Sequence, residues 1–581
     1  SDYQSSGIND MKNKEIAKIF EHIGKLLELK GENPFKVRAY YNAARTINNL
    51  SSNLGNYTST DNLKNIKGIG NALAEKIIEL ISTGTLEYLN RLESEISPEV
   101  IEMLQIPGLG VKKVRKLVDE LGVQSIGELE YACFENRIKL LDGFGQKSQE
   151  KILQGIDLIR SFHGHMLYSD AEILSDQLLA ELKMIPGFIY LSTAGSLRRC
   201  CETVEQLVFI ASISHIELDT LENHLILLDS VKRIIEHENN KVTIGLYNDF
   251  ICILKFFDEE YFPAALYYNT GSVEHVASMN VYAKKNGYEI KDDGLYHNGD
   301  IVTIHNEQEL FDQLNMAFIP PEIRENTDEI EAACSNGIPA LVEDTDIRGI
   351  FHIHTVWSDG SDSIAELAKA SRKMGMEYIG ISDHSVSAGY AGGLSVERLK
   401  AQWDEIDAWN ETDNGIYIFK GIESDILGGG ALDYDERILD KFDFVIVSVH
   451  SKFNMSKEEA TERIIRAISH PSVTMLGHPT GRLLLARKGY PVDIERVLES
   501  CVEHGVAVEL NANPRRLDLD WRYLRLAASL GVKISINPDA HDISSLSQYR
   551  YGVKIARKGW LAKKDILNTA PLEKIKIILS G

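Results

Sequence analysis

The chain has 581 residues, a length that corresponds to about three to five domains. Hydrophobic residues make up 44% and charged residues 25% of the chain, which excludes a fibrous protein and wholesale disorder. No run of about 18 apolar residues occurs, so we expect neither a transmembrane helix nor a membrane partner. Six cysteines are scattered without Cys-x-x-Cys spacing, which favours a reduced, cytoplasmic setting over a disulfide framework.

The net charge of −24 argues against a nucleic-acid-binding coat over the whole surface. Residues 1–160 contain 21 lysines and arginines against 22 aspartates and glutamates, so their net charge is −1 and the rest of the chain carries −23. An excess of acidic residues can hold cations in a carboxylate-rich site, or it can simply keep the protein soluble. Charge alone does not choose between these two interpretations.

Residues 10–160 are predicted to be helical, because apolar residues recur at helical spacing from Ile16 to Leu27 and from Ala72 to Ile81. A short pattern repeats three times within this region: two glycines flank one apolar residue, and a helix that carries lysine follows. The copies are Gly68-Ile69-Gly70 before Lys76, Gly108-Leu109-Gly110 before Lys112, and Gly143-Phe144-Gly145 before Lys147.

Each copy predicts a helix, a tight turn and a second helix. The glycines let the backbone approach a phosphate, and the N-terminus of the second helix offers it free N–H groups. The pattern resembles the helix-hairpin-helix motif of DNA-binding proteins, which grips the DNA backbone without reading sequence. We expect DNA contacts from Gly68, Gly70, Lys76, Gly108, Gly110, Lys112, Gly143 and Gly145. Three ordinary helix-turn-helix corners are the structural alternative.

Residues 165–340 mix strands with helices, and the predicted strands span residues 188–191, 207–210 and 250–254. Residues 347–581 instead alternate seven short apolar runs with helical stretches, which predicts a parallel sheet closed or nearly closed into a barrel. The runs span residues 349–353, 378–381, 416–422, 444–449, 473–476, 506–510 and 532–536. The carboxyl ends of barrel strands share one rim, where active sites are found.

Six of the seven runs are followed at once by residues that can bind metal ions. These residues are His352, His354, Asp359, Asp383, His384, Glu423, His450, His478, Asp539 and His541. His352 and His354 stand two positions apart on a strand and therefore point to the same side. Burying so many imidazoles and carboxylates without metal would be costly, so we expect a cluster of ions. A lone strand-end histidine is more often a core residue, and His470 and His504, away from the rim, are expected to be structural.

Imidazole mixed with carboxylate favours manganese, zinc or iron over magnesium, which prefers oxygen ligands. Closely spaced metal ions lower the pKa of a bound water and clamp a phosphate during its displacement. We therefore expect phosphoester hydrolysis with Mn²⁺ as the first choice of cofactor, and with Zn²⁺ or Fe as alternatives.

These residues resemble the ligands of the polymerase-and-histidinol-phosphatase (PHP) domain family. The resemblance implies about three metal ions. One would lie on His352, His354, Glu423 and Asp539, a second on Glu423, His450 and His478, and a third on Asp359, His384 and His541. The first set holds the residues expected to be catalytic.

The remaining chain resembles the bacterial DNA polymerase X family, in which a family X polymerase core precedes a PHP nuclease domain. The resemblance rests on residues 33–40, the first glycine pattern, and residues 195–199, 270–275 and 319–322. It implies a multidomain α+β and α/β protein. Its domains would be a helical DNA-binding domain at 1–85, a helical domain with two further hairpin motifs at 86–162, a palm at 163–260, a thumb and linker at 261–345, and a (β/α)₇-like PHP barrel at 346–581.

Lys76 falls where relatives with sugar-phosphate lyase activity carry the Schiff-base lysine, and a contact with DNA phosphate is the other interpretation. The palm departs from the family pattern. Gln206 and Val208 stand where the family has the two aspartates that hold catalytic Mg²⁺. We expect Asp249 to be the surviving third carboxylate, and Ser196 and Arg199 to be residual phosphate contacts. Phosphoryl transfer from a nucleotide needs carboxylate-held metal ions, so we expect little or no templated polymerisation and no firmly held palm Mg²⁺.

The sequence therefore predicts a DNA repair nuclease that acts from 3′ ends without sequence preference, on gapped or nicked DNA held by the helical domains. The resemblance also suggests action on abasic sites and 3′-phosphates. Arg482, Arg515 and Arg516 could hold substrate phosphates or form ordinary salt bridges. The alternatives are an active gap-filling polymerase, a catalytically idle DNA-end scaffold and a small-molecule phosphatase. No protein partner is indicated.

Overall fold

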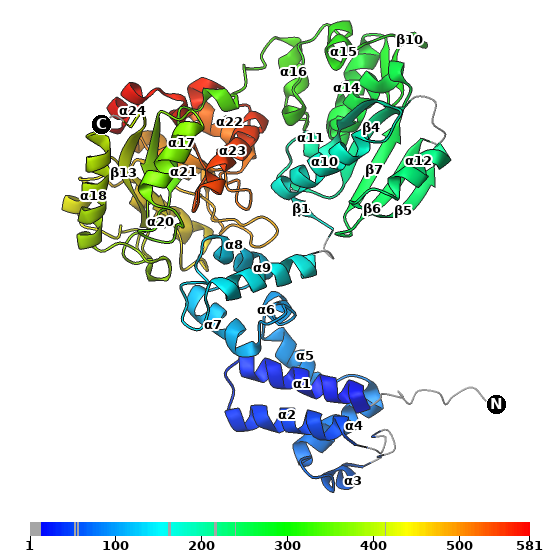
Figure 1. Cartoon of the computed structure of the whole chain (residues 1–581), viewed down its shortest axis with the longest axis vertical. Helices are drawn as coiled ribbons and strands as arrows, with labels where there is room; N and C mark the ends of the chain where they lie inside the picture. The colour runs from blue at the N-terminus through cyan, green and yellow to red at the C-terminus, as the bar shows by residue number, and fades with distance from the viewer. Residues whose placement is uncertain are drawn as a thin grey trace. The chain divides into compact units, whose positions relative to one another are not determined.

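The computed structural model describes residues 13–50, 54, 57, 59–160, 164–213, 218–238, 240–412 and 414–580 (Figure 1). The chain divides into two compact units, one of residues 1–133 and 142–159 and the other of residues 134–141 and 160–581. The short segment 134–141 therefore packs with the second unit although it lies between two stretches of the first. Within the described ranges, no helix combines the length and apolar character needed to cross a bilayer.

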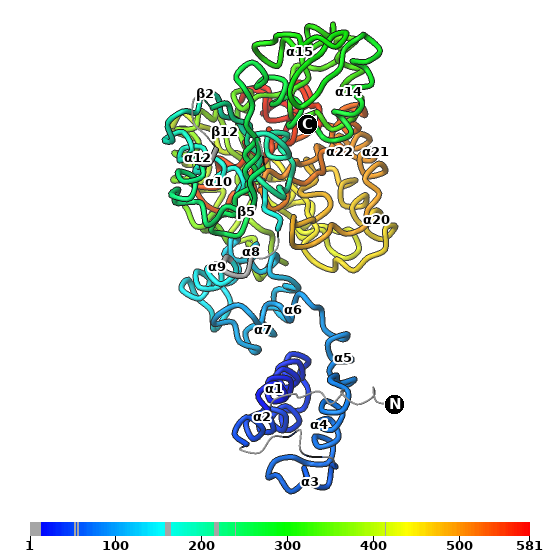
Figure 2. The backbone as a smooth tube through the Cα atoms, turned by 90° about the vertical axis from the view of Figure 1, so that its right-hand side faces the viewer, coloured from blue at the N-terminus to red at the C-terminus, as the bar shows by residue number. Residues whose placement is uncertain are grey.

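The first unit is helical, as the apolar spacing predicts. Its helices are α1 (Asn13–Leu29), α2 (Pro34–Asn48), α3 (Thr60–Lys64), α4 (Asn71–Thr83), α5 (Glu87–Ser94), α6 (Pro98–Met103), α7 (Val111–Leu121), α8 (Ile126–Phe134) and α9 (Gln146–Arg160). Helices α1 and α2 lie side by side in Figures 1 and 2. They bury the predicted apolar face, including Ile16, Phe20 and Ile23, against Tyr40 and Ile47.

The three glycine patterns form three similar turns. The first glycine of each, Gly68, Gly108 or Gly143, has a φ between 80° and 96°, a left-handed conformation that suits glycine. The second glycine then leads directly into α4, α7 or α9. A helix precedes the third copy too, but α8 ends at Phe134 and residues 135–140 form a longer series of turns before Gly143.

The second unit begins with a palm-like region that contains the three predicted strands. Its elements are β1 (Met166–Leu167), α10 (Tyr168–Lys183), β2 (Phe188–Thr193), α11 (Gly195–Arg198), β3 (Thr203–Val204), β4 (Leu207–Ile213), α12 (Leu218–Leu225), β5 (Val231–Glu238), β6 (Lys241–Leu246) and β7 (Ile251–Phe256). A five-stranded sheet has the order β2-β4-β7-β6-β5, in which β4 and β7 run parallel. Its core includes Phe209, Ile244 and Leu254.

A mixed helical and antiparallel region follows. It consists of α13 (Phe262–Thr270), α14 (Val273–Lys285), β8 (Tyr288–Lys291), β9 (Gly294–His297), β10 (Asp300–Val302), α15 (Glu307–Gln313) and α16 (Glu329–Cys334). Ser272 caps α14 by accepting a hydrogen bond from the backbone N–H of His275. The three strands form a sheet of their own, with the order β10-β9-β8.

The last region is the predicted barrel of seven parallel strands. The strands are β11 (Gly349–Ile353), β12 (Tyr378–Ile381), β13 (Tyr417–Asp425), β14 (Phe444–Ser448), β15 (Met475–Leu476), β16 (Ala507–Asn511) and β17 (Ile534–Asn537), hydrogen-bonded in that order. A bridge between Ile353 and Ala540, just after β17, brings the two edges together. The sequence prediction of a nearly closed barrel is therefore confirmed.

Helices cover the outside of these strands (Figure 1). They are α17 (Ile364–Lys373), α18 (Val396–Asn410), α19 (Glu436–Leu439), α20 (Lys457–Ile468), α21 (Ile494–His504), α22 (Trp521–Leu530), α23 (Tyr549–Lys558) and α24 (Leu572–Leu579). Capping boxes start α17 at Ser363 and α20 at Ser456. Left-handed Gly505 and Gly531 end α21 and α22. These local signals fix where each helix begins or ends and so where each strand-end loop is placed.

Aromatic side chains pack together in the barrel, and glycines on neighbouring strands make room for them. Phe351 and Phe444 meet edge to face with their ring centroids 5.0 Å apart. A Cβ on Gly380 or Gly421 would collide with the ring of Phe444. The rim residues after the strands therefore stand on a densely packed support.

Candidate metal centre

The structure brings the nine histidine and carboxylate positions of the predicted ligand set together at one rim. Eight of the nine residues are buried, and the side chain of His450 is only 5% exposed. They come from six strand ends, as the sequence pattern predicts, since parallel strands place their carboxyl ends on the same side. Within the described residues, they form four groups whose ligand atoms lie within 4.8 Å of one another, and a fifth such group includes Glu135.

Glu423, at the end of β13, lies at the centre of the cluster. Its Oε1 atom is 3.0 Å from His478 Nε2, 3.1 Å from His450 Nε2 and 3.3 Å from His352 Nε2. Its Oε2 atom is 3.2 Å from His384 Nδ1. One carboxylate therefore faces several imidazoles and can bridge more than one cation.

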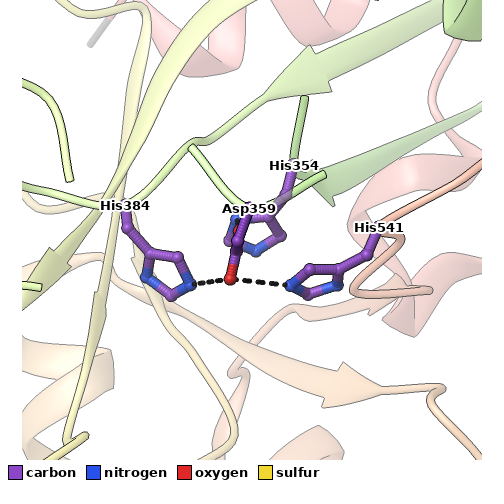
Figure 3. Close-up of side chains that lie close together, drawn as sticks. All are labelled: His354, Asp359, His384 and His541. Carbon is purple, nitrogen blue, oxygen red and sulfur yellow. Dashed lines mark ion pairs between the residues drawn. The ribbon is translucent and has the colours of Figure 1, made fainter. Parts of the chain in front are cut away.

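Asp359 organises the other side of the cluster (Figure 3). Its Oδ2 atom lies 3.3 Å from His384 Nε2 and 3.4 Å from His541 Nε2. His354 stands between this side and the first, with Nδ1 3.5 Å from Asp359 and Nε2 3.3 Å from Asp539 Oδ1. The two halves of the cluster are therefore continuous.

The donor atoms fit metal ions better than they fit one another. Several buried ring nitrogens have no hydrogen-bond partner: His352 Nε2, both nitrogens of His354 and of His384, His478 Nδ1 and His541 Nε2. Buried polar atoms are normally hydrogen-bonded, so such a group needs another partner. Two ligand atoms about 2.1 Å from one ion lie about 3.0–3.4 Å apart, which is the spacing of most pairs in this cluster.

The backbone is strained at two residues of the cluster. His352 has a φ of 60° and Asp539 a φ of 53°, a left-handed conformation that is uncommon for residues other than glycine. The pairing register between β11 and β12 shifts between Ile350 and Ile353, so His352 lies in a bulge. Backbone strain of this kind is typical of functional sites, where it orients a side chain toward the site.

The carboxylates of the cluster are ionised. Burial by itself would raise the pKa of Glu423, but the imidazoles of His450 and His352 hold that pKa well below its usual range. Burial opposes protonation of His541, yet Asp359 raises the pKa of His541 to about 10. The protein thus holds concentrated negative charge that protons or metal cations must balance.

Two further acidic residues orient imidazoles of the cluster, and a third supports a neighbouring loop. Glu509, on β16, lies 2.5 Å from Nδ1 of His352, and Asp425 lies 2.6 Å from Nδ1 of His450. Each carboxylate accepts the Nδ1 hydrogen and leaves Nε2 facing the centre. Asp383 accepts hydrogen bonds from Thr355 instead, so it supports the neighbouring loop and belongs to none of the metal-capable groups found among the described residues.

Sequence reasoning missed Glu509 as a functional residue. It stands between the apolar residues Val508 and Leu510 of β16, and a charged residue at such a place in a predicted strand is the signal that could have found it. His470 and His504 lie outside the cluster, where His470 accepts a hydrogen bond from Ser472 N and His504 approaches the Ser500 carbonyl.

The three arginines near the rim differ in their surroundings. Arg516 is buried, with Nε 3.8 Å from Asp539 Oδ2. Arg482 forms an ion pair of 2.6 Å with Asp520 and donates to the Arg516 carbonyl. Arg515 stacks on the ring of Phe134 at 3.6 Å. Arg516 is therefore the arginine that borders the metal-capable cluster.

The expected DNA-contact residues lie in the first unit. Gly68, Gly108 and Gly143 are exposed, as is Lys112, whereas Gly145 and Lys76 are half-buried. A Cβ on Gly70, Gly108, Gly110, Gly143 or Gly145 would meet no atom within 4 Å, so open space lies beside these turns. The Lys76 ammonium lies 4.8 Å from the centre of the Tyr88 ring, beside Lys36 and Arg91.

The expected palm carboxylate, Asp249, lies apart from the strand position of Val208. Asp249 is exposed in the turn before β7 and forms an ion pair of 2.7 Å with Lys232. The residue that pairs with Val208 across the parallel strands is Ile253. Asp249 therefore does not stand opposite Val208, and an apolar residue does.

The other two palm residues lie close to α11. Arg199 binds Glu325 at 2.8 Å, and Glu325 also pairs with Lys558 of α23. Ser196 lies in the first turn of α11. The guanidinium of Arg199 thus has an internal acidic partner, which a DNA phosphate would have to displace.

Four stretches of the chain match known families. Residues 11–86 match the helix-hairpin-helix domain and residues 100–157 the SAM-like helix-hairpin-helix tandem. Residues 265–325 match the DNA polymerase beta thumb, and residues 351–513 match the PHP domain. These matches confirm the architecture that the sequence motifs predicted.

Curated relatives extend the similarity to the full length. The chain is 38% identical over 573 residues to the DNA polymerase/3′-5′ exonuclease PolX of Bacillus subtilis (strain 168), covering 98% of this chain and 99% of the relative. It is 32% identical over 230 residues to a probable phosphatase of Thermoanaerobacter sp. (strain X514), covering 38% of this chain and 89% of that protein. A probable phosphatase of Acetivibrio thermocellus is also 32% identical, over 228 residues.

Proposed function

Because the chain belongs to the PolX family of DNA polymerase/3′-5′ exonucleases, we propose that its barrel is a manganese-dependent nuclease that removes nucleotides from DNA 3′ ends. The observation that carries this proposal is the buried cluster around Glu423 and Asp359, in which imidazole nitrogens lack hydrogen-bond partners. Bound cations would lower the pKa of a water molecule and offset charge on a phosphodiester.

The protein residues have distinct roles in this proposal. Glu423 faces imidazoles on both sides of the cluster and would hold the cations between them. Glu509 and Asp425 hold His352 and His450 with Nε2 toward the centre. Arg516, buried beside Asp539, is placed to pair with a non-bridging oxygen of the substrate phosphate.

Manganese is the proposed metal because the cluster mixes six imidazoles with three carboxylates. Such a set suits Mn²⁺, Zn²⁺ or Fe better than Mg²⁺. The proposed number is about three ions, since the nine residues form four groups whose ligand atoms lie within 4.8 Å of one another and the PHP domain family uses about three.

The helical unit supports DNA as the substrate. Its three glycine turns present open backbone before the N-termini of α4, α7 and α9, where a DNA phosphate can approach. We propose gapped or nicked DNA and free 3′ ends, bound in the cytoplasm without sequence preference. Contacts of this kind act on the backbone and carry no base information.

We further propose that templated polymerisation is weak or lost. Gln206 is neutral and Val208 offers no ligand, and Ile253 stands opposite Val208. Asp249 is paired with Lys232. Without adjacent carboxylates, the two Mg²⁺ ions that nucleotidyl transfer requires have no protein ligands at these positions.

The nuclease proposal is tested with purified protein, Mn²⁺ and a 5′-labelled primer that has a recessed 3′ end. Wild type should shorten the primer stepwise, and the His352→Ala/His354→Ala double variant should lose at least about 100-fold of that rate. The control is His504→Ala, which removes a histidine outside the cluster. Equal degradation by wild type and the double variant would defeat the proposal.

The same proteins separate the two non-nuclease alternatives. A DNA-end scaffold would bind gapped DNA but retain no metal, which elemental analysis measures directly. A small-molecule phosphatase would release phosphate from p-nitrophenyl phosphate while leaving the primer intact.

The polymerase alternative is tested by filling a one-nucleotide gap with Mg²⁺ and all four nucleotides, with the Bacillus subtilis relative as the positive control. We expect no extension by this protein. Extension that disappears in Asp249→Ala would contradict the proposal and restore a role for that carboxylate.

A further inference from the structure

The segment 134–141 reaches the rim of the barrel, although in sequence it connects α8 to α9 of the helical unit. Asn136 donates hydrogen bonds from Nδ2 to the carbonyl of Asp359 at 3.1 Å and to Ser361 Oγ at 3.0 Å. The guanidinium of Arg137 lies 4.5 Å from the centre of the Tyr390 ring. The segment is thus attached to the loop that carries one of the proposed metal ligands.

Glu135 projects from this segment into the cluster. Its side chain is 4% exposed, and Arg137 Nη2 lies 2.6 Å from its carboxylate. One carboxylate oxygen of Glu135, one of Asp539 and one ring nitrogen of His541 lie within 4.8 Å of one another. Nε2 of His541 is buried and has no hydrogen-bond partner.

The buried charges around Glu135, Asp539 and His541 favour a bound cation. The side chains of Glu135 and Asp539 are 4% and 3% exposed, and one carboxylate oxygen of each lies within 4.8 Å of a ring nitrogen of His541. Two buried carboxylates, Glu135 and Asp539, therefore approach the same imidazole. Bringing like charges together in a buried site is costly unless a cation lies between them.

We propose that Glu135 is a further ligand of the barrel metal centre, so that segment 134–141 supplies a carboxylate to a divalent cation shared with Asp539 and His541. This inference rests on the proposed metal centre and adds a ligand from outside the barrel sequence. It also makes metal binding and docking of the segment interdependent. If the cation binds more tightly when the segment is docked, then the bound cation stabilises docking by the same free energy that docking adds to cation binding.

The test uses the full chain and Mn²⁺ alone as the probe. Glu135→Gln keeps the shape of the side chain and removes its charge, and we expect at least one Mn²⁺ to bind about 10-fold more weakly or worse. Asp142→Asn is the matched control, because it removes an exposed carboxylate from the same connection. It should bind Mn²⁺ as wild type does.

A second variant tests the docking independently of the carboxylate. Asn136 has a φ of 57°, so Asn136→Gly keeps that backbone conformation available while removing the amide. We expect weaker Mn²⁺ binding from this variant as well. Hydrogen–deuterium exchange over residues 134–141 should slow when Mn²⁺ is added to wild type and respond little in Glu135→Gln.

The outcomes distinguish this inference from the metal centre itself. If wild type retains no Mn²⁺, the metal centre is wrong and Glu135 has no ion to bind. If wild type binds Mn²⁺ and Glu135→Gln binds every ion with unchanged affinity, the centre stands and this inference is overturned, whatever the exchange data show.

Discussion

At the scale of single residues, Glu423 is the carboxylate of the cluster that faces the most imidazoles. It faces five imidazoles, and removing its charge would leave those imidazoles without their common anion. A bridging carboxylate would contribute to more than one cation at once. Replacing it should therefore weaken metal binding more than replacing any single histidine does.

We therefore expect Glu423→Gln to retain less than half of the wild-type Mn²⁺ and to lose more than about 100-fold of nuclease activity. Elemental analysis and the primer assay measure the two effects. Glu573→Gln, a neutralisation on the exposed face of α24, is the control. Wild-type metal content in Glu423→Gln would mean that the carboxylate is not a ligand.

At the scale of elements, the barrel depends on close packing between glycines and aromatic rings. Gly421 on β13 faces the ring of Phe444 on β14, so a methyl group at that position has no space. Glu423 lies near the end of β13 and His450 follows β14, so displacing either strand would also displace a residue of the cluster.

Gly421→Ala should lower the free energy of unfolding of the barrel by about 1–3 kcal/mol. Gly429→Ala, where a Cβ meets no atom within 4 Å, should leave stability unchanged. Denaturant unfolding followed by tryptophan fluorescence compares the two variants. Equal stability in both would show that β13 shifts to accommodate the methyl group.

A buried ion pair joins elements of the palm-like region and the mixed region that follows it. Glu307, the first residue of α15, binds Arg324 at 2.7 Å and Arg198 of α11 at 3.0 Å. Burial would raise the pKa of Glu307, but the two arginines hold it below its usual range. Its contribution to stability is therefore complete above the unfolded-state pKa of about 4.3 and is lost as the pH falls through the lower folded-state value.

Glu307→Gln should destabilise the protein by about 3–5 kcal/mol at pH 7, because it leaves two arginines without a buried counter-charge. Thermal unfolding at pH 7 and at successively lower pH measures the effect. The difference in unfolding temperature between the variant and wild type should shrink below a pH of about 4, because the wild-type carboxylate becomes protonated there. A difference in unfolding temperature that stays constant across that pH range would contradict the role of Glu307 as the ionised partner of the two arginines.

At the scale of the whole molecule, much of the architecture could be predicted from the sequence. The seven strands and the nine proposed ligand positions followed from periodicity and from chemistry at strand ends, because both signals are local. The left-handed bulge at His352 and the supporting role of Glu509 could not be predicted, since they depend on neighbouring strands. The position of Glu135 could not be predicted either, because no local pattern relates it to Asp539, about 400 residues later in the chain.

The helical unit should determine how tightly the molecule binds DNA. If Lys112 contacts one phosphate, Lys112→Ala should reduce the slope of log K against log salt concentration by about 0.9 on duplex DNA of any sequence. Fluorescence anisotropy across a range of salt concentrations measures this slope. Lys574→Ala, in α24, should leave it unchanged.

The excursion of residues 134–141 has a practical consequence for dissecting the protein. A fragment cut at residue 346 looks like a self-sufficient phosphoesterase, yet it omits the octapeptide that donates Asn136 and Glu135 to the rim. Properties measured on that fragment would describe an incomplete pocket. Supplying the missing peptide in trans, or grafting it through a short tether, is the appropriate comparison before any behaviour of the fragment is attributed to the intact enzyme.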